Sequence, residues 1–425
     1  MADDIESWLK KNWDPDLTVR EWWEKLGLAG WSAPNLPIDS FGKGYSREET
    51  VHVQNAIAAH GALGAPGGLG LLLAAPTIAV HGTKDQKEEY IRDIVCGKKA
   101  WCQLFSEPGA GSDLAGLTTR AVLDGEEWVI NGQKVWTSGG QIADLGMLLA
   151  RSDPEVPKHQ GITYFAIEMD QEGIEVRPLR EMTGRAIFNE VFLTDAKIPK
   201  GNDIGGLGEG WKVANSTLSF ERAGLGAGGG SQAGGLALPG TKALDLDKRA
   251  GDFLTGSVRG EPGPSMIAQT TGMLIELAKS NGKVNSPLVR QALAELHTLN
   301  EIARYTNLRQ KALKVSGLDV PGIGNIAKLS MSDILRKTRD LGLELLGPRG
   351  TVHAYDKDAR KVLDEVVPNA FATIITELSL FAQGPSIYGG TDEIQHNIIG
   401  ERVLGLPKEP NNDKTMPFSS LPKNA

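Results

Sequence analysis

The pattern of hydrophobic and polar positions changes twice along the chain. Up to about Ala100 it is typical of helices, and a charged helix is predicted from Gly82-Thr83-Lys84 through Ile94. From about residue 101 to residue 210 the period shortens to that of strands. From Trp211 to about Leu404 the helical period returns. A helical region, a strand region and a second helical region in this order are uncommon, so the order reduces the number of folds that the chain could adopt.

The middle region holds short runs that alternate or are wholly apolar. These strand-like runs are Glu127 to Ile130, Leu145 to Ala150, Ile162 to Glu168 and Glu190 to Leu193. The turn signals between them are Asp124-Gly125, Asn131-Gly132, Gly139-Gly140 and Glu172-Gly173. Several short strands with tight turns predict a small β-barrel or sandwich.

The third region contains one long helical pattern and one segment that departs from it. Leu288 to Lys314 carries apolar residues at spacings of three and four, with few breakers. From Gly224 to Pro264 the chain is dense in glycine and proline, which predicts a loop or lid. The expected domains are residues 1–100, 101–210 and 211–405, with an insertion at about 236–265 in the third. The tail, 406–425, is polar and rich in proline, and we expect it to be poorly ordered.

Composition and charge exclude several classes of protein. The 425 residues carry a formal net charge of −8, which argues against nucleic-acid binding. The two cysteines, Cys96 and Cys102, match no zinc spacing, so we expect two buried free thiols and no metal site. The longest apolar stretch, Gly67 to Val80, is too short to span a membrane and contains Pro76. Without a signal-like N-terminus, these features predict a cytoplasmic enzyme.

The strongest local signal for chemistry is Ser106-Glu107-Pro108-Gly109-Ala110-Gly111-Ser112-Asp113. Small residues in a tight turn let a ligand approach backbone N–H groups closely. The glycine spacing differs from a dinucleotide fingerprint, and no βαβ pattern surrounds it. A plain glycine-rich turn is the alternative for this segment alone.

A second segment lies about thirty residues further on, Val135-Trp136-Thr137-Ser138-Gly139-Gly140, at the end of a predicted strand. Trp136 offers a large face to a planar ring, and Ser138 offers a hydrogen bond. Taken alone, Trp136 is better explained as a core residue.

Together, QLFSEPGAGSD and NGQKVWTSGG resemble the flavin-facing β-domain of the acyl-CoA dehydrogenases, and the similarity extends from about Gly82 to Leu406. The resemblance implies an α+β fold: an N-terminal helical domain, a middle β-barrel domain and a C-terminal four-helix bundle, with FAD between barrel and bundle. It further implies roles for the two segments. Phe105 and Ser106 would hydrogen-bond the flavin ring, and Trp136 and Ser138 would cover its other edge. The turn with Gly111 and Ser112 would lie near the phosphates of the cofactor or of CoA.

The same resemblance implies an acyl-CoA substrate and a catalytic base, which removes the α-proton while a β-hydride passes to flavin N5. Most members carry this glutamate in a Tyr-Glu-Gly-Thr motif, but here the matching segment reads Tyr388-Gly389-Gly390-Thr391. The backbone N–H of Gly389 would still donate to the thioester oxygen. A minority of members carry the base on an earlier helix, before an arginine, where this chain has Glu221-Arg222. We therefore predict Glu221 as the base and a structural or electrostatic role for Arg222; a surface Glu–Arg pair is the alternative.

Other segments resemble the family's cofactor-binding motifs but differ from them at some positions. An Arg-x-x-Phe-Gly motif that reaches a neighbour's FAD is replaced here by Ala278-Lys279-Ser280-Asn281-Gly282. A glycine-rich companion motif survives with Gly347 and Gly350, and Thr391 and Glu393 match positions near the adenosine end of the cofactor. This mixture resembles the paired, heterotetrameric acyl-CoA dehydrogenases of actinobacterial steroid degradation, with the present chain as the subunit that carries the base.

The resemblance implies an electron-transfer flavoprotein as partner and a homo- or heterotetramer. The glycines from Gly224 to Gly235 follow Glu221 directly, and we expect them to make room for a bulky acyl group; close helix packing is the alternative. Three functions remain open beside a dehydrogenase: an acyl-CoA oxidase, a non-catalytic subunit of a heteromeric enzyme, and a CoA- or lipid-binding protein without redox chemistry.

Overall fold

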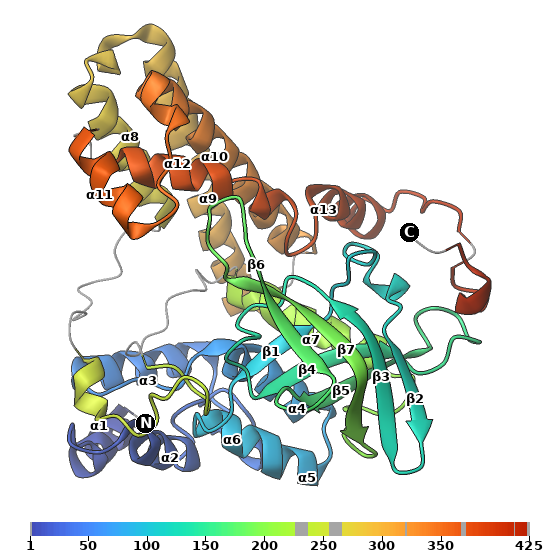
Figure 1. The fold of residues 1–425 in the computed structure, drawn as a ribbon. Helices are drawn as coiled ribbons and strands as arrows, with labels where there is room; N and C mark the ends of the chain where they lie inside the picture. Colours follow the sequence, from blue (N-terminus) through green and yellow to red (C-terminus); the bar gives the residue numbers. More distant parts are fainter. Residues whose placement is uncertain are drawn as a thin grey trace. The chain divides into compact units, whose positions relative to one another are not determined.

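The computed structural model describes residues 2–225, 237–254, 266–318, 321–366, 371–411 and 413–422. Contacts divide the chain into two compact units, both drawn in Figure 1. Unit 1 comprises Met1–Leu179, Ala186–Gly260 and Asn411–Ala425, and unit 2 comprises Arg180–Arg185 and Glu261–Pro410. Along the chain the elements run from helices through strands back to helices, so the predicted order is confirmed.

Unit 1 begins with short helices. They are α1 (Ala2–Asn12), α2 (Val19–Leu28), η1 (Ile38–Ser40), α3 (Arg47–Ala59), η2 (Gly70–Ala74), α4 (Ala75–His81), α5 (Lys84–Gln86), η3 (Lys87–Ile91) and α6 (Arg92–Val95). The predicted charged helix is confirmed as α5, η3 and α6 in succession, and Thr83 opens it with a capping box. The indole N–H groups of Trp22 and Trp23 donate to the carbonyls of Leu63 and Gly64 at 2.6 and 2.8 Å. Both tryptophans are thereby buried without unpaired polar groups.

The middle of unit 1 is one seven-stranded sheet with the path β1-β4-β2-β3-β7-β6 and β5 paired to β4. The strands are β1 (Trp101–Leu104), β2 (Arg120–Asp124), β3 (Glu127–Lys134), β4 (Leu145–Arg151), β5 (Ile162–Glu168), β6 (Ile174–Leu179) and β7 (Phe188–Pro199). A single curled sheet is closer to the predicted barrel than to a two-sheet sandwich (Figure 1). Every residue of β4 is buried, because the strand has a hydrophobic cluster on each of its faces.

The turn predicted at Asn131-Gly132 is wrong. Strand β3 continues through both residues, and its register against β7 shifts between Ile130 and Gly132, which marks a β-bulge. The Asn131 side chain exchanges hydrogen bonds with Asp195 opposite, and a Cβ on Gly132 would meet the Thr119 hydroxyl at 2.4 Å. An Asn-Gly pair therefore serves a bulge and a close approach here, whereas the predicted turns at Gly125, Gly139 and Gly173 are confirmed with positive φ.

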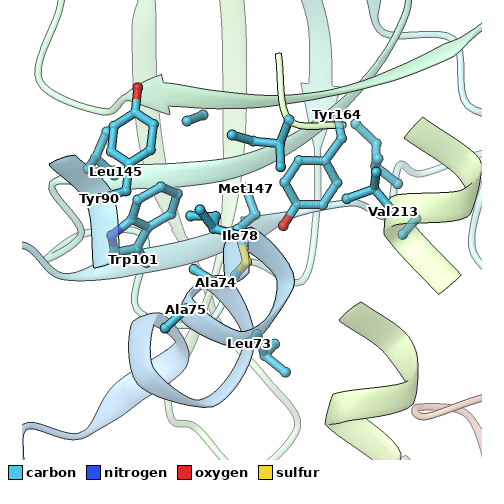
Figure 2. Packing of buried hydrophobic residues seen from close by; sticks show 14 of the residues in the cluster. Leu73, Ala74, Ala75, Ile78, Tyr90, Trp101, Leu145, Met147, Tyr164 and Val213 are labelled. Atoms are coloured by element: carbon cyan, nitrogen blue, oxygen red, sulfur yellow. The ribbon is translucent and has the colours of Figure 1, made fainter. Parts of the chain in front are cut away.

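Helix α7 (Gly210–Leu225) also belongs to unit 1. Its buried Val213 and Ala214 join a cluster that includes Leu73, Ile78, Met147 and Tyr164. Figure 2 shows Val213 beside Tyr164 of the sheet, with Leu73 and Ile78 of the N-terminal helices in the same cluster. The helix is thus anchored to both the sheet and the N-terminal helices.

The part of the predicted loop or lid that the structure describes, 237–254, is packed onto unit 1. The amides of Val19 and Arg20 donate to the carbonyls of Lys248 and Leu246 at 2.9 and 2.8 Å. Ala237, Leu246 and Ala250 lie in the core of the N-terminal helices, and η5 (Ala250–Phe253) ends the segment. Residues 226–236 and 255–265 lie outside the described residues, and with them most of the glycine run proposed to make room for a bulky acyl group.

Unit 2 is helical around its own core. Its elements are α8 (Met266–Ser280), η6 (Lys283–Asn285), α9 (Pro287–Val315), α10 (Ile323–Leu346), η7 (Gly347–Thr351), α11 (Lys357–Val366), α12 (Ala372–Phe381), η8 (Gly384–Ser386), α13 (Asp392–Ile398) and η9 (Ile399–Val403). The predicted helix from Leu288 to Lys314 is confirmed as α9. Leu274, Leu296, Leu341 and Ile375 bring α8, α9, α10 and α12 to one buried cluster.

The prediction of a poorly ordered tail is wrong for 413–422, which packs on unit 1 and includes η10 (Phe418–Ser420). Its Phe418 is buried, because an apolar ring in a polar segment stabilises docking where composition alone suggests disorder.

Both cysteines are confirmed as buried free thiols, and burial raises the pKa of Cys96 to about 11. None of the described helices has the length and apolar character to cross a membrane.

Candidate functional site

The candidate site begins where strand β1 ends. Phe105 is buried, and its ring meets the ring of Tyr164 edge-on, with centroids 5.8 Å apart. The amide of Val135 donates to the carbonyl of Ser106 at 2.9 Å. The structure therefore brings Ser106 next to the segment that leads into Trp136.

A buried ion pair holds these two segments together. The Lys134 ammonium donates to the Glu107 carboxylate at 2.8 Å and to the carbonyl of Phe105 at 3.0 Å. Glu107 also accepts from the amides of Thr118 and Thr119, at 2.7 and 2.9 Å. The Lys134 side chain is fully buried and that of Glu107 nearly so. One carboxylate therefore fixes both ends of the loop that runs from Glu107 to Thr119.

The Glu107 carboxyl is held in its charged form. Burial acts to raise its pKa, but the charge and hydrogen bond of Lys134, together with hydrogen bonds from Thr119 and Thr118, lower the pKa to about 2. A carboxylate that stays ionised at physiological pH suits a structural clamp and makes Glu107 a poor proton acceptor.

Trp136 lies at a strained turn and presents its ring outward. Its φ is 63°, which is rare for a bulky residue, and its side chain is 57% exposed. The ring of Phe188 meets it edge-on at 5.7 Å between centroids. The turn is fixed behind it, since Asn189 and Thr137 exchange backbone hydrogen bonds at 3.0 Å. Ser138 is half-buried in the same turn.

The loop residues Gly111 and Ser112 are exposed, and a Cβ built on Gly111 meets no atom within 4 Å. Just beyond them, the Asp113 carboxylate accepts from Lys158 at 2.9 and 3.0 Å. The loop therefore combines an open tip at Gly111 with an end that is fixed at Asp113.

Glu221 lies near the end of α7 and is half-buried. It follows Val213 and Thr217 at intervals of four, and both of these are fully buried. The Thr217 hydroxyl lies 2.9 Å from that of Thr77 in α4, and His81 bonds Ser216 at 2.8 Å. Glu221 thus continues the face of α7 that packs into unit 1. Arg222 is the next residue of α7.

The predicted residues of the C-terminal motif lie in unit 2, between η8 and α13. Gly389 and Gly390 have positive φ, and their carbonyls accept from Gln395 at 2.9 and 3.2 Å. Thr391 caps α13, its hydroxyl accepting from Ile394 at 3.2 Å. Glu393 is exposed.

Asp392 is the fixed point of this segment. Its carboxylate accepts from Lys328 at 2.9 Å and from Arg336 at 2.7 Å, both from α10. Burial acts to raise its pKa, but the hydrogen bonds from Lys328, Arg336 and Ser332 hold the pKa well below the usual range. Asp392 is therefore a clamp for the 387–391 segment, and a carboxylate held in its charged form in this way is a poor proton acceptor.

The remaining predicted positions also lie in unit 2. Gly347 has a positive φ at the end of α10, and Gly350 lies in η7. In the segment that replaces the family's arginine and phenylalanine, Asn281 donates to the carbonyl of Leu345 at 2.8 Å. Lys283 donates to the carbonyl of Glu344 at 2.6 Å. These side chains close the end of α10.

The structure thus brings together Phe105, Ser106 and the turn of Trp136 and Ser138 in unit 1, and Gly389 to Glu393 in unit 2. Their roles toward a ligand stay predictions. Sequence reasoning missed two clamps, Glu107 with Lys134 and Asp392 with Lys328 and Arg336. A signal existed for the first, because a lysine at a strand position beside two motifs calls for a nearby acid, and Glu107 is part of the first motif. For the second, Lys328 and Arg336 lie two helical turns apart on α10, a spacing common on exposed helix faces.

Comparisons with known proteins agree with this arrangement. Family models match residues 1–98 as the acyl-CoA dehydrogenase N-terminal domain, 102–196 as the middle domain and 271–404 as the C-terminal domain. Acyl-CoA dehydrogenase IpdE1 of Mycobacterium tuberculosis is 32% identical over 92% of this chain and 88% of its own length.

Two solved structures have the same fold. The ChsE4-ChsE5 complex from Mycobacterium tuberculosis matches with a TM-score of 0.64 at 25% identity, over 96% of this chain and 97% of that chain. The Tcur3481-Tcur3483 steroid ACAD matches with a TM-score of 0.68 at 24% identity, over 96% and 97%. The family resemblance and the predicted fold class, a helical domain, a curled-sheet domain and a second helical domain, are thereby confirmed.

Proposed function

The chain belongs to the acyl-CoA dehydrogenase family, and from this premise we propose that it oxidises the Cα–Cβ bond of an acyl-CoA thioester with FAD as cofactor and Glu221 as base. The observation that carries the assignment of the base is the place of Glu221 on α7. It continues the face of the buried Val213 and Thr217 and is itself half-buried, which places a carboxylate beside the apolar cluster of unit 1.

The position suits a proton acceptor. Phe220 and Leu218 of the same helix pack against the apolar cluster of unit 1. Water competes less for the lone pairs of a half-buried carboxylate, which favours removal of a proton from carbon. The contacts of Thr217 with Thr77 and of Ser216 with His81 fix the helix one turn earlier, so the carboxylate starts from a defined backbone.

The residues in unit 1 fit FAD. Trp136 exposes a large aromatic face, Ser106 and Ser138 lie in the segments beside it, and Gly111 leaves open space for a phosphate to approach the backbone. FAD, when bound, supplies the acceptor for the β-hydride. We assign Phe105, Ser106, Trp136 and Ser138 to the ring and Gly111 and Ser112 to phosphate groups. Gly347, Gly350, Thr391 and Glu393 are the proposed contacts from unit 2.

Gly389 takes part through its backbone. A donor to the thioester oxygen stabilises the charge that develops there as the α-proton leaves. The clamp of Asp392 by Lys328 and Arg336 holds the adjacent 387–391 backbone in place. A backbone donor to the thioester oxygen needs no side chain at position 389. We assign the Gly389 N–H to this role.

We further propose a bulky, steroid-derived acyl group, an unlike partner subunit in a tetramer, and an electron-transfer flavoprotein as electron acceptor. Support for the partner subunit comes from the segment Ala278 to Gly282, which lacks the family's arginine and phenylalanine and in which Asn281 instead donates to the carbonyl of Leu345 at the end of α10. The similarity to the ChsE4-ChsE5 complex supports the same assembly.

The test is made on the protein purified alone and co-expressed with candidate partner subunits. Each protein sample is loaded with FAD, and a panel of acyl-CoA thioesters that includes steroid-derived ones is then added in the absence of oxygen. The flavin absorbance near 450 nm is followed. Loss of absorbance that persists until an electron acceptor is added supports a dehydrogenase. Rapid recovery in air indicates an oxidase, and no change with any thioester in any assembly contradicts the proposal.

A further inference from the structure

Residues 413–422 dock on the connection between β4 and β5. The amides of Phe418 and Ser419 donate to the carbonyls of Val156 and Pro154, both at 2.9 Å. Pro417 forms an isolated bridge with Pro157. The segment therefore pairs with this connection as a short strand does, through backbone contacts that do not depend on its side chains.

Two side chains carry the contact inward. The Arg151 guanidinium stacks on the Phe418 ring, its central carbon 3.4 Å from the ring centroid. Arg151 also donates to the carbonyls of Ala115 and Leu117, at 2.7 and 3.1 Å, and it is 3% exposed. Phe418 thus covers the cation that ties down the chain just after Asp113, and excluding water strengthens those hydrogen bonds.

Lys158 forms the second connection. Its ammonium donates to both oxygens of Asp113 and also to Asp413. Only 7% of the lysine side chain is exposed. Asp113 ends the glycine-rich loop, and Asp413 begins the docked segment, so one buried cation joins them.

We propose that residues 413–422 act as a brace for the Gly109–Asp113 loop, and that Arg151 and Lys158 are positioning residues for the phosphate group which that loop takes. This rests on the proposed function, since the loop is assigned there to the phosphates of FAD or CoA. A loop of small residues loses much conformational entropy when it closes on a ligand, and a brace that fixes its end lowers this loss.

The test compares Phe418→Ala with Phe418→Trp, which keeps an aromatic face under Arg151, and with Met416→Ala, a change at an exposed position of the same segment. Three quantities are measured in the full chain: hydrogen–deuterium exchange of residues 107–119, the Kd for FAD, and KM and kcat for an acyl-CoA. For Phe418→Ala we expect faster exchange and a rise of about tenfold in either the Kd for FAD or the KM, with kcat at saturation little changed. Phe418→Trp restores most of this, and Met416→Ala resembles the wild type.

A change in the Kd for FAD assigns the loop to the cofactor, and a change in KM alone assigns it to CoA. Unchanged exchange in Phe418→Ala overturns the brace, and faster exchange with both constants unchanged overturns its link to phosphate binding. If the wild type takes up no FAD in any assembly, the proposed function fails, while the exchange data still decide whether the brace exists.

Discussion

Each unit holds one group of the candidate residues, and the two groups fix their backbone in the same way but differ in the acid that remains for chemistry. In unit 1 the Glu107 carboxylate is clamped by Lys134, and in unit 2 the Asp392 carboxylate is clamped by Lys328 and Arg336. Both carboxyl groups have lowered pKa values. Only unit 1 adds Glu221 on a packed helix, whereas unit 2 has Gly389 at the position where most family members carry the base.

In the proposed mechanism the base lies on α7 and not at position 389, and the comparison teaches how a site of this family tolerates such a relocation. The segment around Gly389 keeps its shape through Asp392 and the cap at Thr391, neither of which depends on residue 389. Helix α7 is fixed by contacts one turn before Glu221. The carboxylate that serves as base can therefore lie on α7 and not at position 389 while both segments keep their backbone conformation.

The largest effect is expected for Glu221→Gln, which removes the proton acceptor and keeps the shape. Turnover should fall about 10²- to 10⁴-fold, because this is the usual contribution of a positioned general base. The rate of flavin bleaching by an active acyl-CoA measures it. Glu209→Gln near the start of α7, an exposed partner of Lys212, is the matched control and should leave the rate unchanged. Equal rates in Glu221→Gln and wild type would remove the distinction between the two groups of residues.

Glu107→Gln should destabilise unit 1 by about 3–5 kcal/mol, because it leaves the buried Lys134 ammonium without its counter-charge. The double variant Glu107→Gln with Lys134→Met should recover much of the loss. The midpoint of urea unfolding measures both, and Glu175→Gln, which breaks an exposed pair with Arg177, should change little. A loss below about 1 kcal/mol would contradict the clamp.

The same clamp predicts a pH dependence. The folded pKa of Glu107, about 2, lies below the ordinary value of 4.5, so its contribution is present above pH 4.5 and is lost as pH falls toward 2. This amounts to roughly 3 kcal/mol over that window. Unfolding free energies measured from pH 5 to pH 2 should fall more steeply in wild type than in Glu107→Gln, and parallel curves would contradict the assignment.

Asp392→Asn should cost about 2–3 kcal/mol in unit 2, since it leaves Lys328 and Arg336 without their shared acceptor. Hydrogen exchange of α10 and α13 reports the loss locally. Asp333→Asn removes another, longer contact of Arg336 at 3.9 Å and should cost less than about 0.5 kcal/mol. If the two variants behave alike, Asp392 is no clamp and the parallel with Glu107 fails.

Gly389→Ala is expected to have the smallest effect, a loss of about 1 kcal/mol, because the φ of 64° disfavours any residue with a Cβ. Gly324→Ala is its opposite: that glycine is within α10 with no atom within 4 Å of a built Cβ, so alanine should stabilise by about 0.5–1 kcal/mol. Thermal unfolding of the two variants tests the sign of both changes.

The sequence was sufficient for the elements with a clear period. The strand at Ile162 to Glu168 and the long helix α9 follow directly from runs of apolar residues, and both are confirmed. The two motifs were predicted to face one flavin ring, and the structure places them side by side through the Val135–Ser106 hydrogen bond, while their roles toward a ligand stay predictions. The half-buried place of Glu221 could also be predicted, because its spacing of four from Thr217 and eight from Val213 is visible in the sequence.

Features that depend on distant partners could not be predicted in this way. Asn131-Gly132 has the composition of a turn, and only Asp195 on the facing strand makes it a bulge. The docked segment at 413–422 has the composition of a disordered tail, and its order depends on Arg151 and Lys158 more than 250 residues earlier in the chain. The periodicity of apolar residues predicts single helices and strands. Ion pairs between residues that are far apart in the sequence produce no such periodicity, so they cannot be predicted from it.

The most direct test of the central claim, that Glu221 is the base, separates proton removal from hydride transfer. An acyl-CoA with hydrogens at Cα but none at Cβ, such as 3,3-dimethylbutyryl-CoA, is incubated in D₂O with FAD-loaded wild type and Glu221→Gln, and α-deuterium uptake is followed by mass spectrometry. The account predicts exchange with wild type and at least about 100-fold slower exchange with Glu221→Gln. Equal exchange with both proteins would show that another group takes the α-proton.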